Sequence, residues 1–185
     1  MINKIKSSFV LFTILLGLLS SCSDELNFDQ FDDLDVTPTF ESSILFIEIE
    51  ESIINFSQVI AGSIVQDIDF DAFSQDLFAK RVISGVVTYE IENTTSKDIT
   101  ISFGFLDENG VLTDTETFNV GKAPPLVSLK REVVYGPGGK SLDIIKNTVK
   151  IRLSATNTSG DYVSVNQPDS KVVLKSKGEF KVRLK

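Results

Sequence analysis

The chain has 185 residues with 18 Lys and Arg against 26 Asp and Glu, a formal charge of −8 at pH 7, and its composition excludes several kinds of site. It contains no His, which excludes a His-based catalytic triad, a His metal site and a His pH switch. Its one Cys cannot form an internal disulfide or a multi-cysteine zinc site. Nucleic-acid binding is disfavoured for so acidic a chain, and we expect no cofactor.

The N-terminus has the organisation of an export signal. Two lysines precede an apolar core of 11 residues, 9–19, which is too short to span a bilayer as a helix. The core ends in Leu19-Ser-Ser-Cys22, which resembles the lipobox of bacterial lipoproteins. That resemblance implies that residues 1–21 are a signal peptide and that Cys22 is the lipidated first residue of the mature chain. The alternative is a buried structural Cys beside a secretory signal, but exported proteins seldom keep a free thiol.

Charge is divided unevenly along the rest of the chain. Residues 22–79 carry 14 acidic and no basic side chains, whereas residues 80–185 carry 12 acidic and 16 basic ones. We expect residues 22–39 to form an extended acidic tether. The asymmetry predicts that the acidic part packs beside the basic C-terminal strand, that the tether holds the domain off anionic headgroups, or both.

Acidic residues directly after the lipidated Cys also resemble the surface-export signal of Bacteroidetes lipoproteins. That resemblance implies an outer-membrane, lipid-anchored protein exposed at the cell surface. A plain spacer, with the domain on the periplasmic face of the membrane, is the alternative.

Residues 40–185 are expected to form a single domain of short strands. Alternating apolar and polar residues predict strands that bury one face each. The expected strands are Ile44–Glu50, Val87–Glu92, Ile99–Leu106, Val111–Val120, Val127–Val134, Val149–Thr156 and Phe180–Lys185. Asn109-Gly110 predicts a tight hairpin, and Thr158–Asp161 a second one. Seven to nine such strands indicate an all-β fold, an immunoglobulin-like antiparallel β-sandwich with one or two short helices.

Capping residues predict where those helices lie. Asp69 or Asp71 is expected to begin a short helix that continues through Phe78. Ser141 is expected to cap Leu142–Lys146, with its apolar side turned inward. The apolar segment Ile53–Asp67 is consistent with a strand followed by a loop, or with a helix.

A second resemblance covers most of the chain. It rests on strand and turn patterns at Phe70–Phe73, Val86–Thr94, Asp98–Asp107 and Ser170–Leu184. These are similar to uncharacterised lipoproteins of Flavobacterium-like Bacteroidetes. The resemblance implies a β-sandwich lipoprotein and carries over no catalytic residue.

One cluster of acids has the alternation of a calcium loop. Asp67, Asp69 and Asp71 are spaced like the first ligands of an EF-hand, but such a loop would need Gly and Glu where the chain has Ala72 and Phe78. A looser Ca²⁺ site at the three aspartates remains a candidate. We favour the alternative of a capped loop with solvated acids, and assign no metal.

Three functions are compatible with these patterns. The preferred one is a non-catalytic binding or accessory module of the envelope, with a membrane anchor and an envelope protein or glycan as partner. A basic ladder on the last strand suits an acidic glycan, or a solvated, edge-protecting face. The alternatives are a carboxylate-dependent glycan hydrolase, which needs two converging acids in a cleft, and a purely structural envelope lipoprotein.

Overall fold

The computed structural model describes residues 35–70, 73, 76–161, 163 and 169–184, which belong to one compact unit that begins at Asp35. Cys22, Asp71 and most of the expected tether lie outside these residues. The elements are β1 (Thr39–Glu50), α2 (Glu51–Ala61), β2 (Ile64–Asp69), α3 (Asp76–Ala79), β3 (Val82–Asn93), β4 (Ile99–Leu106), β5 (Leu112–Val120), β6 (Val127–Tyr135), α4 (Leu142–Lys146), β7 (Lys150–Asn157) and β8 (Lys171–Val182).

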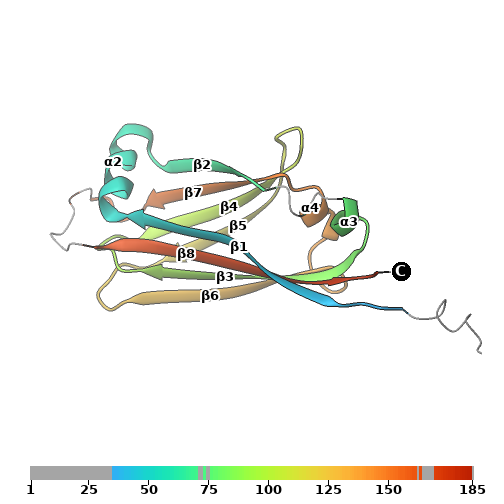
Figure 1. Cartoon of the computed structure of the whole chain (residues 1–185). Coiled ribbons are helices and arrows are strands. Elements are labelled where there is room, and N and C mark those ends of the chain that lie inside the picture. The colour runs from blue at the N-terminus through green and yellow to red at the C-terminus, as the bar shows by residue number, and fades with distance from the viewer. Residues whose placement is uncertain (1–34, 71–72, 74–75, 162, 164–168, 185) are drawn as a thin grey trace, which may run out of the picture. The chain divides into compact units, whose positions relative to one another are not determined.

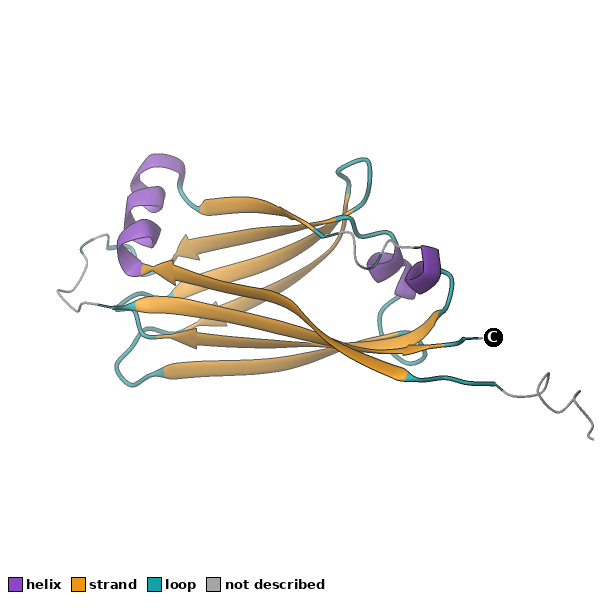
Figure 2. Cartoon of the chain, viewed as in Figure 1, coloured by secondary structure: helices purple, strands orange, loops and turns teal. Residues whose placement is uncertain are grey.

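The strands form two four-stranded antiparallel sheets that pack face to face (Figures 1 and 2). Their orders are β1-β8-β3-β6 and β2-β7-β4-β5. The pairing is nested, because β1 pairs with β8, β2 with β7, β3 with β6 and β4 with β5. Apart from the β4–β5 hairpin, every link between consecutive strands crosses to the other sheet. The expected all-β sandwich is therefore confirmed, and its strand order is that of a double-sheet jelly roll.

Ion pairs between side chains connect the strands in three of the four nested pairs. The pairs are Glu41 with Lys177 and Glu48 with Lys171 between β1 and β8, Asp67 with Arg152 and Asp69 with Lys150 between β2 and β7, and Glu90 with Lys130 between β3 and β6. In each of them the acid lies on the earlier strand. The predicted packing of the acidic N-terminal part beside the basic C-terminal strand is confirmed for β1 and β8. Hydrogen bonding to Glu41 and Glu179 raises the pKa of Lys177 to about 12.

The basic ladder of the last strand does not protect a sheet edge. β8 is a central strand between β1 and β3, so its two edges are already paired. Lys171, Lys175 and Lys177 lie beside acids of both neighbours. The edge-protecting interpretation is therefore wrong, because alternation shows which face of a strand is solvated but not which strands lie beside it.

The inward faces of the two sheets form one aromatic and aliphatic core. Tyr89 of β3 packs against Phe103 and Phe118 of the opposite sheet, with ring centroids 5.1 and 5.2 Å away. A second cluster gathers near α3, where Phe73 and Phe78 contact the ring of Phe180. That ring lies over backbone, since a Cβ on either Gly85 or Gly178 would overlap it. Core packing thus rests on Phe, Tyr, Ile, Val and Leu in a chain without Trp.

The capping residues predicted one helix correctly and the start of another incorrectly. Ser141 caps α4 by accepting a hydrogen bond from the Asp143 N–H, and the helix spans the expected residues. The helix expected to begin at Asp69 begins later, at Asp76, because Asp69 continues the β2 ladder opposite Lys150. The ambiguous segment at 53–67 contains both kinds of element, most of α2 followed by the start of β2.

The two expected hairpins also differ in outcome. Between β4 and β5 the turn forms as predicted, with Gly110 at φ 75° and the Asp107 carboxylate accepting from the N–H groups of Asn109 and Val111. Thr158–Asp161 is not a hairpin, because β7 and β8 belong to different sheets. The Gly160 turn instead begins a link that crosses the sandwich.

We expect Gly85→Ala to destabilise the domain by about 1–3 kcal/mol, because the added methyl displaces Phe180 from a close-packed site. Urea unfolding of the variant, compared with the exposed control Thr115→Ala on β5, measures the cost. A midpoint equal to that of the control would show that the Phe180 ring does not rest on this backbone.

Candidate functional site

A buried polar network fixes α2 to one end of the sandwich. The Glu51 carboxylate accepts hydrogen bonds from the N–H and the hydroxyl of Ser96, at 2.9 and 2.7 Å. Asn55 accepts from the Asn157 amide, and the Gln58 side chain accepts from the Asn157 N–H. The helix is therefore held by polar groups from the β3–β4 link and from the end of β7, so its polar side faces the protein.

Further hydrogen bonds make the loops beneath α2 rigid. Asn93, which is fully buried, donates to the carbonyls of Lys97 and Gly121 and accepts from the N–H and hydroxyl of Thr95. Lys97 is also buried, and its ammonium group pairs with Asp161 and donates to the Val163 carbonyl. This end of the sandwich is a satisfied polar framework, which is expensive to disrupt.

The opposite face of α2 is apolar and exposed. Ile53, Phe56, Val59 and Ile60 retain 49%, 68%, 69% and 68% of their accessible surface. We call these four side chains the α2 face. The helix buries Ile54 together with Glu51 and Asn55 and leaves its other large apolar side chains in solvent, whereas an ordinary surface helix buries its apolar stripe. Contiguous exposed apolar side chains of this kind mark interaction surfaces more often than scattered single ones do.

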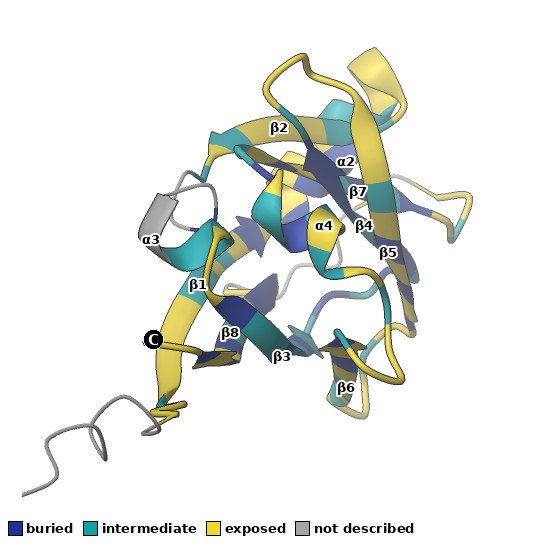
Figure 3. Cartoon of the chain, turned by 90° about the vertical axis from the view of Figure 1, so that its right-hand side faces the viewer, coloured by how far each residue is buried: buried dark blue, intermediate teal, exposed yellow. Residues whose placement is uncertain are grey.

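At the other end of the sandwich, β1 begins and β8 ends (Figures 1 and 3). Basic side chains gather there. A hollow of about 280 Å³ is lined there by Lys80, Arg81, Ile83, Arg183 and Leu184. Asp35, at the start of the described unit, forms an ion pair with Arg183 at 3.2 Å. We call this feature the basic hollow.

Two carboxylates, Asp114 and Glu116 of the edge strand β5, point inward between the sheets. The Lys140 ammonium lies 2.5 Å from an oxygen of each, and Arg131 contacts the second Glu116 oxygen at 3.3 Å. Burial alone would lower the pKa of Lys140, but hydrogen bonds to Asp114 and Glu116 raise it above its ordinary value. The two acids therefore share one cation, and these ion pairs join β5 to the β6–α4 link. We call Asp114, Glu116 and Lys140 the clasp.

Two buried tyrosines lie near this clasp. Burial, assisted by the nearby acids Glu116 and Asp114, raises the pKa of both Tyr89 and Tyr135 well above the ordinary value. Their hydroxyls stay protonated at neutral pH. A raised tyrosine pKa disfavours the tyrosinate that a nucleophile or base would need.

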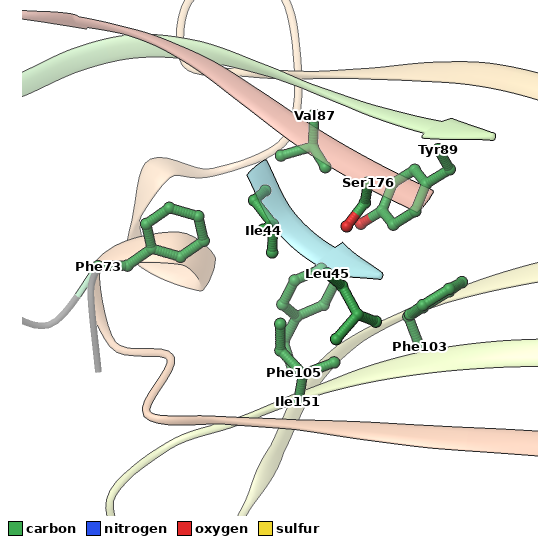
Figure 4. A pocket seen from close by; sticks show the side chains of 9 residues that line it. All are labelled: Ile44, Leu45, Phe73, Val87, Tyr89, Phe103, Phe105, Ile151 and Ser176. Atoms are coloured by element: carbon green, nitrogen blue, oxygen red, sulfur yellow. The ribbon is translucent and has the colours of Figure 1, made fainter. Parts of the chain in front are cut away.

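The other hollows have different characters. One lies inside the core, lined by Phe73, Val87, Tyr89 and neighbouring side chains, and holds about 10 Å³ of free space, roughly one water molecule (Figure 4). The second, of about 260 Å³, is a shallow depression on the outer face of the β1-β8-β3-β6 sheet. It is lined by Phe46, Glu90, Lys175 and Lys177, whose charged members are engaged in the cross-strand pairs described above.

The candidate calcium ligands are only partly within the described residues. Asp67 and Asp69 point outward on β2, where Asp67 accepts two hydrogen bonds from Arg152, at 2.6 and 2.7 Å. The hydrogen bond from Arg152 lowers the pKa of Asp67. Lys150 is 3.2 Å from Asp69. In the described part of the chain no group of three potential metal ligands is found. A cation at Asp67 and Asp69 would have to displace these ion pairs.

Sequence reasoning did not find the α2 face, the basic hollow or the clasp. Arg81 and Arg183 are about a hundred residues apart in sequence, and only the pairing of β3 with β8 brings them together. One available signal was the alternation Asp114-Thr-Glu116-Thr-Phe118, in which acids share a strand face with a buried aromatic residue.

No family model matches the chain, and no curated protein sequence matches it. Among solved structures, it is similar to a chain of the T13 viral particle of IBDV, with 9% identity over 80% of this chain and 31% of that one, at a TM-score of 0.40. It is also similar to Desmodium yellow mottle tymovirus (9% identity, 82% and 89% covered, TM-score 0.35) and to Bacillus endospore appendages (11%, 90% and 97%, 0.37). The chain spans about a third of the length of the IBDV chain. The described residues include no helix with the length and apolarity that a bilayer crossing requires.

Lys140→Met should destabilise the domain by about 1–3 kcal/mol at pH 7, because Asp114 then loses its cation and Glu116 keeps only its contact with Arg131. Partial exposure of Lys140 weakens its ion pairs by solvent screening. A protonated carboxyl group needs no cation beside it, so the loss should shrink as the pH falls.

Urea unfolding between pH 4.5 and 8 measures this, with Lys122→Met as a matched removal of an exposed lysine. A cost that does not change with pH would mean that Lys140 acts through packing and not through the two carboxylates.

Proposed function

We propose that the protein is a lipid-anchored outer-membrane lipoprotein that acts as a non-catalytic binding module of the envelope, displayed at the cell surface. The lipobox resemblance at Cys22 supports the anchor, and the acidic residues that follow it support surface display. The observation that carries the binding role is the α2 face, an apolar surface held rigidly in solvent by a buried polar network.

The geometry of the sandwich favours this role. The chain enters the unit at Asp35, and β1 then runs 12 residues, roughly 40 Å, before α2 begins. The α2 face consequently lies at the end of the sandwich remote from Asp35, where the described unit begins (Figure 1). A module anchored through residue 22 would hold this face away from its own membrane.

The chemistry of the α2 face favours a protein partner. Its four side chains are purely apolar and carry no hydrogen-bonding group with which to select sugar hydroxyls. Residues 35–79 contain acids but no Lys or Arg, so an anionic membrane would be repelled. The complementary surface is an apolar groove edged with basic side chains on an envelope protein.

Glycan hydrolysis by a carboxylate pair finds less support. The two inward acids share Lys140 and lie within the clasp between the sheets. A purely structural envelope role would leave the exposure of four large apolar side chains on one helix without a purpose.

We expect Cys22→Ser to release the protein from the membrane fraction, because the several acyl chains of a bacterial lipoprotein supply the stable attachment. Fractionation of cells that express the wild type and the variant measures the change. A variant that stays in the membrane fraction, or an unacylated wild-type Cys22 by mass spectrometry, would contradict the anchor. Protease added to intact cells then distinguishes surface display, where the wild type is cleaved, from the periplasmic face, where it is protected.

A photo-crosslinking residue at position 56 should give one protein adduct on cells, whereas the same residue at the exposed control position 115 should give none. The purified partner should bind wild-type protein at least tenfold more tightly than Phe56→Ser, because truncating a central aromatic anchor commonly costs that much. Unfolding of Phe56→Ser should be near wild type, since the side chain is exposed. Adducts only to lipid or to a second copy, or equal affinity of the two proteins, would contradict the proposed role of the α2 face.

A further inference from the structure

The basic hollow is built by residues whose backbone positions are mutually fixed. The Arg183 N–H donates to the Arg81 carbonyl at 2.9 Å, and the Arg81 guanidinium donates to the Leu184 carbonyl at 2.9 Å. The end of β8 is also joined to the incoming chain, because the Leu184 N–H donates to the Val36 carbonyl. The hollow is therefore part of the sandwich, formed where three segments meet.

Its lining combines positive charge with apolar surface. Lys80, Arg81 and Arg183 supply the charge, while Ile83 and Leu184 supply the apolar surface. Asp35 is ion-paired with Arg183 through one nitrogen, Nε, and an arginine offers five N–H donors. Arg183 therefore still has N–H groups that can donate to a further anion while Asp35 is paired with it. Guanidinium groups suit phosphate because their planar fork matches its oxygens.

The position of the hollow points to the source of the phosphate. Asp35 lies 13 residue steps after Cys22, which limits the reach of the intervening chain to about 45 Å. The anchored lipid and the hollow are consequently confined to the same small volume near the membrane, which raises the effective concentration of headgroups. The apolar part of the lining can contact the glycerol and acyl carbons of a lipid. Inorganic phosphate has no such carbon atoms.

We propose that the basic hollow binds the phosphate group of an anionic lipid in the membrane that carries the anchor. The bound headgroup holds the tether end of the sandwich against the membrane and directs the α2 face outward. Asp35 occupies part of the site as an internal competitor. This inference rests on the lipid anchor of the proposed function.

The test uses the mature chain from residue 22 with Cys22→Ser, so that no acyl chain contributes. Binding is measured to vesicles of phosphatidylcholine alone and to vesicles with one third phosphatidylglycerol, at 0.1 M salt. We expect at least tenfold tighter binding to the anionic vesicles. The overall charge of this chain is −10, with 16 basic and 26 acidic residues, so general electrostatic attraction does not explain such a preference.

Two further substitutions are predicted to act in opposite directions. Arg183→Gln should weaken binding about fivefold, the effect expected of one cation near an anionic surface, and Asp35→Asn should strengthen it by removing the competitor. Lys122→Gln makes the same change of net charge as Arg183→Gln in the β5–β6 link and should leave binding unchanged. A global folding defect cannot strengthen binding, so the Asp35→Asn result remains informative whatever Arg183→Gln does to stability.

Each outcome decides the inference. No preference for anionic vesicles, equal effects of Arg183→Gln and Lys122→Gln, or weaker binding by Asp35→Asn would overturn it. Saturable binding of inorganic phosphate at Arg183 without vesicle binding would overturn the lipid as the source. Because the chain tested is not acylated, a failure here leaves the anchor intact. An unacylated Cys22 in cells would overturn the anchor without changing these vesicle measurements.

Discussion

The nested pairing of the first four strands with the last four is the constraint on which the other features depend. It joins an acidic half of the chain to a basic half, and in β1–β8, β2–β7 and β3–β6 the acid always comes from the earlier strand. Individual exposed pairs contribute little to stability. The pairs instead favour the correct strand register, because a slip of one residue would move these charges into the core and the apolar side chains into water. The innermost pair of the nested order, β4–β5, is joined by neutral side-chain hydrogen bonds instead, such as that from Thr100 to Asn119.

This pairing also gives the sandwich two different ends. Because β1 pairs with β8, the point where the chain enters lies beside its C-terminal residues, and Asp35 meets Arg183. Because α2 links β1 to β2 across the sheets, the helix is placed at the opposite end, where Ser96 and Asn157 hold its polar side. A basic end beside Asp35 and an apolar end remote from it are thus consequences of one topology. They suit a module that is held by one end and binds with the other.

Local signals predicted those elements whose sequence pattern agrees with their surroundings. The bounds of β4 match the prediction because its alternation is that of a strand with one buried face. The bounds of α4 match because the preceding residue, Ser141, caps the helix. In α2 the pattern and the surroundings conflict: Glu51 and Asn55 are buried while Phe56 and Ile60 are exposed. Its orientation depends on partners tens of residues away, which no local window contains. Strand neighbours were equally out of reach, since alternation identifies a buried face and not the strand beside it.

The orientation of the sandwich on its membrane is the most direct test of this account. If Cys22 is acylated, a cysteine introduced at Thr39 or at Phe56 is the only free thiol, so a fluorescent donor can be placed at either end of the domain. Energy transfer to acceptors on lipid headgroups then reports the height of each end in reconstituted vesicles. The account predicts strong transfer from position 39 and much weaker transfer from position 56, because about 40 Å of β1 separates them. Equal transfer from both positions, or stronger transfer from position 56, would contradict it.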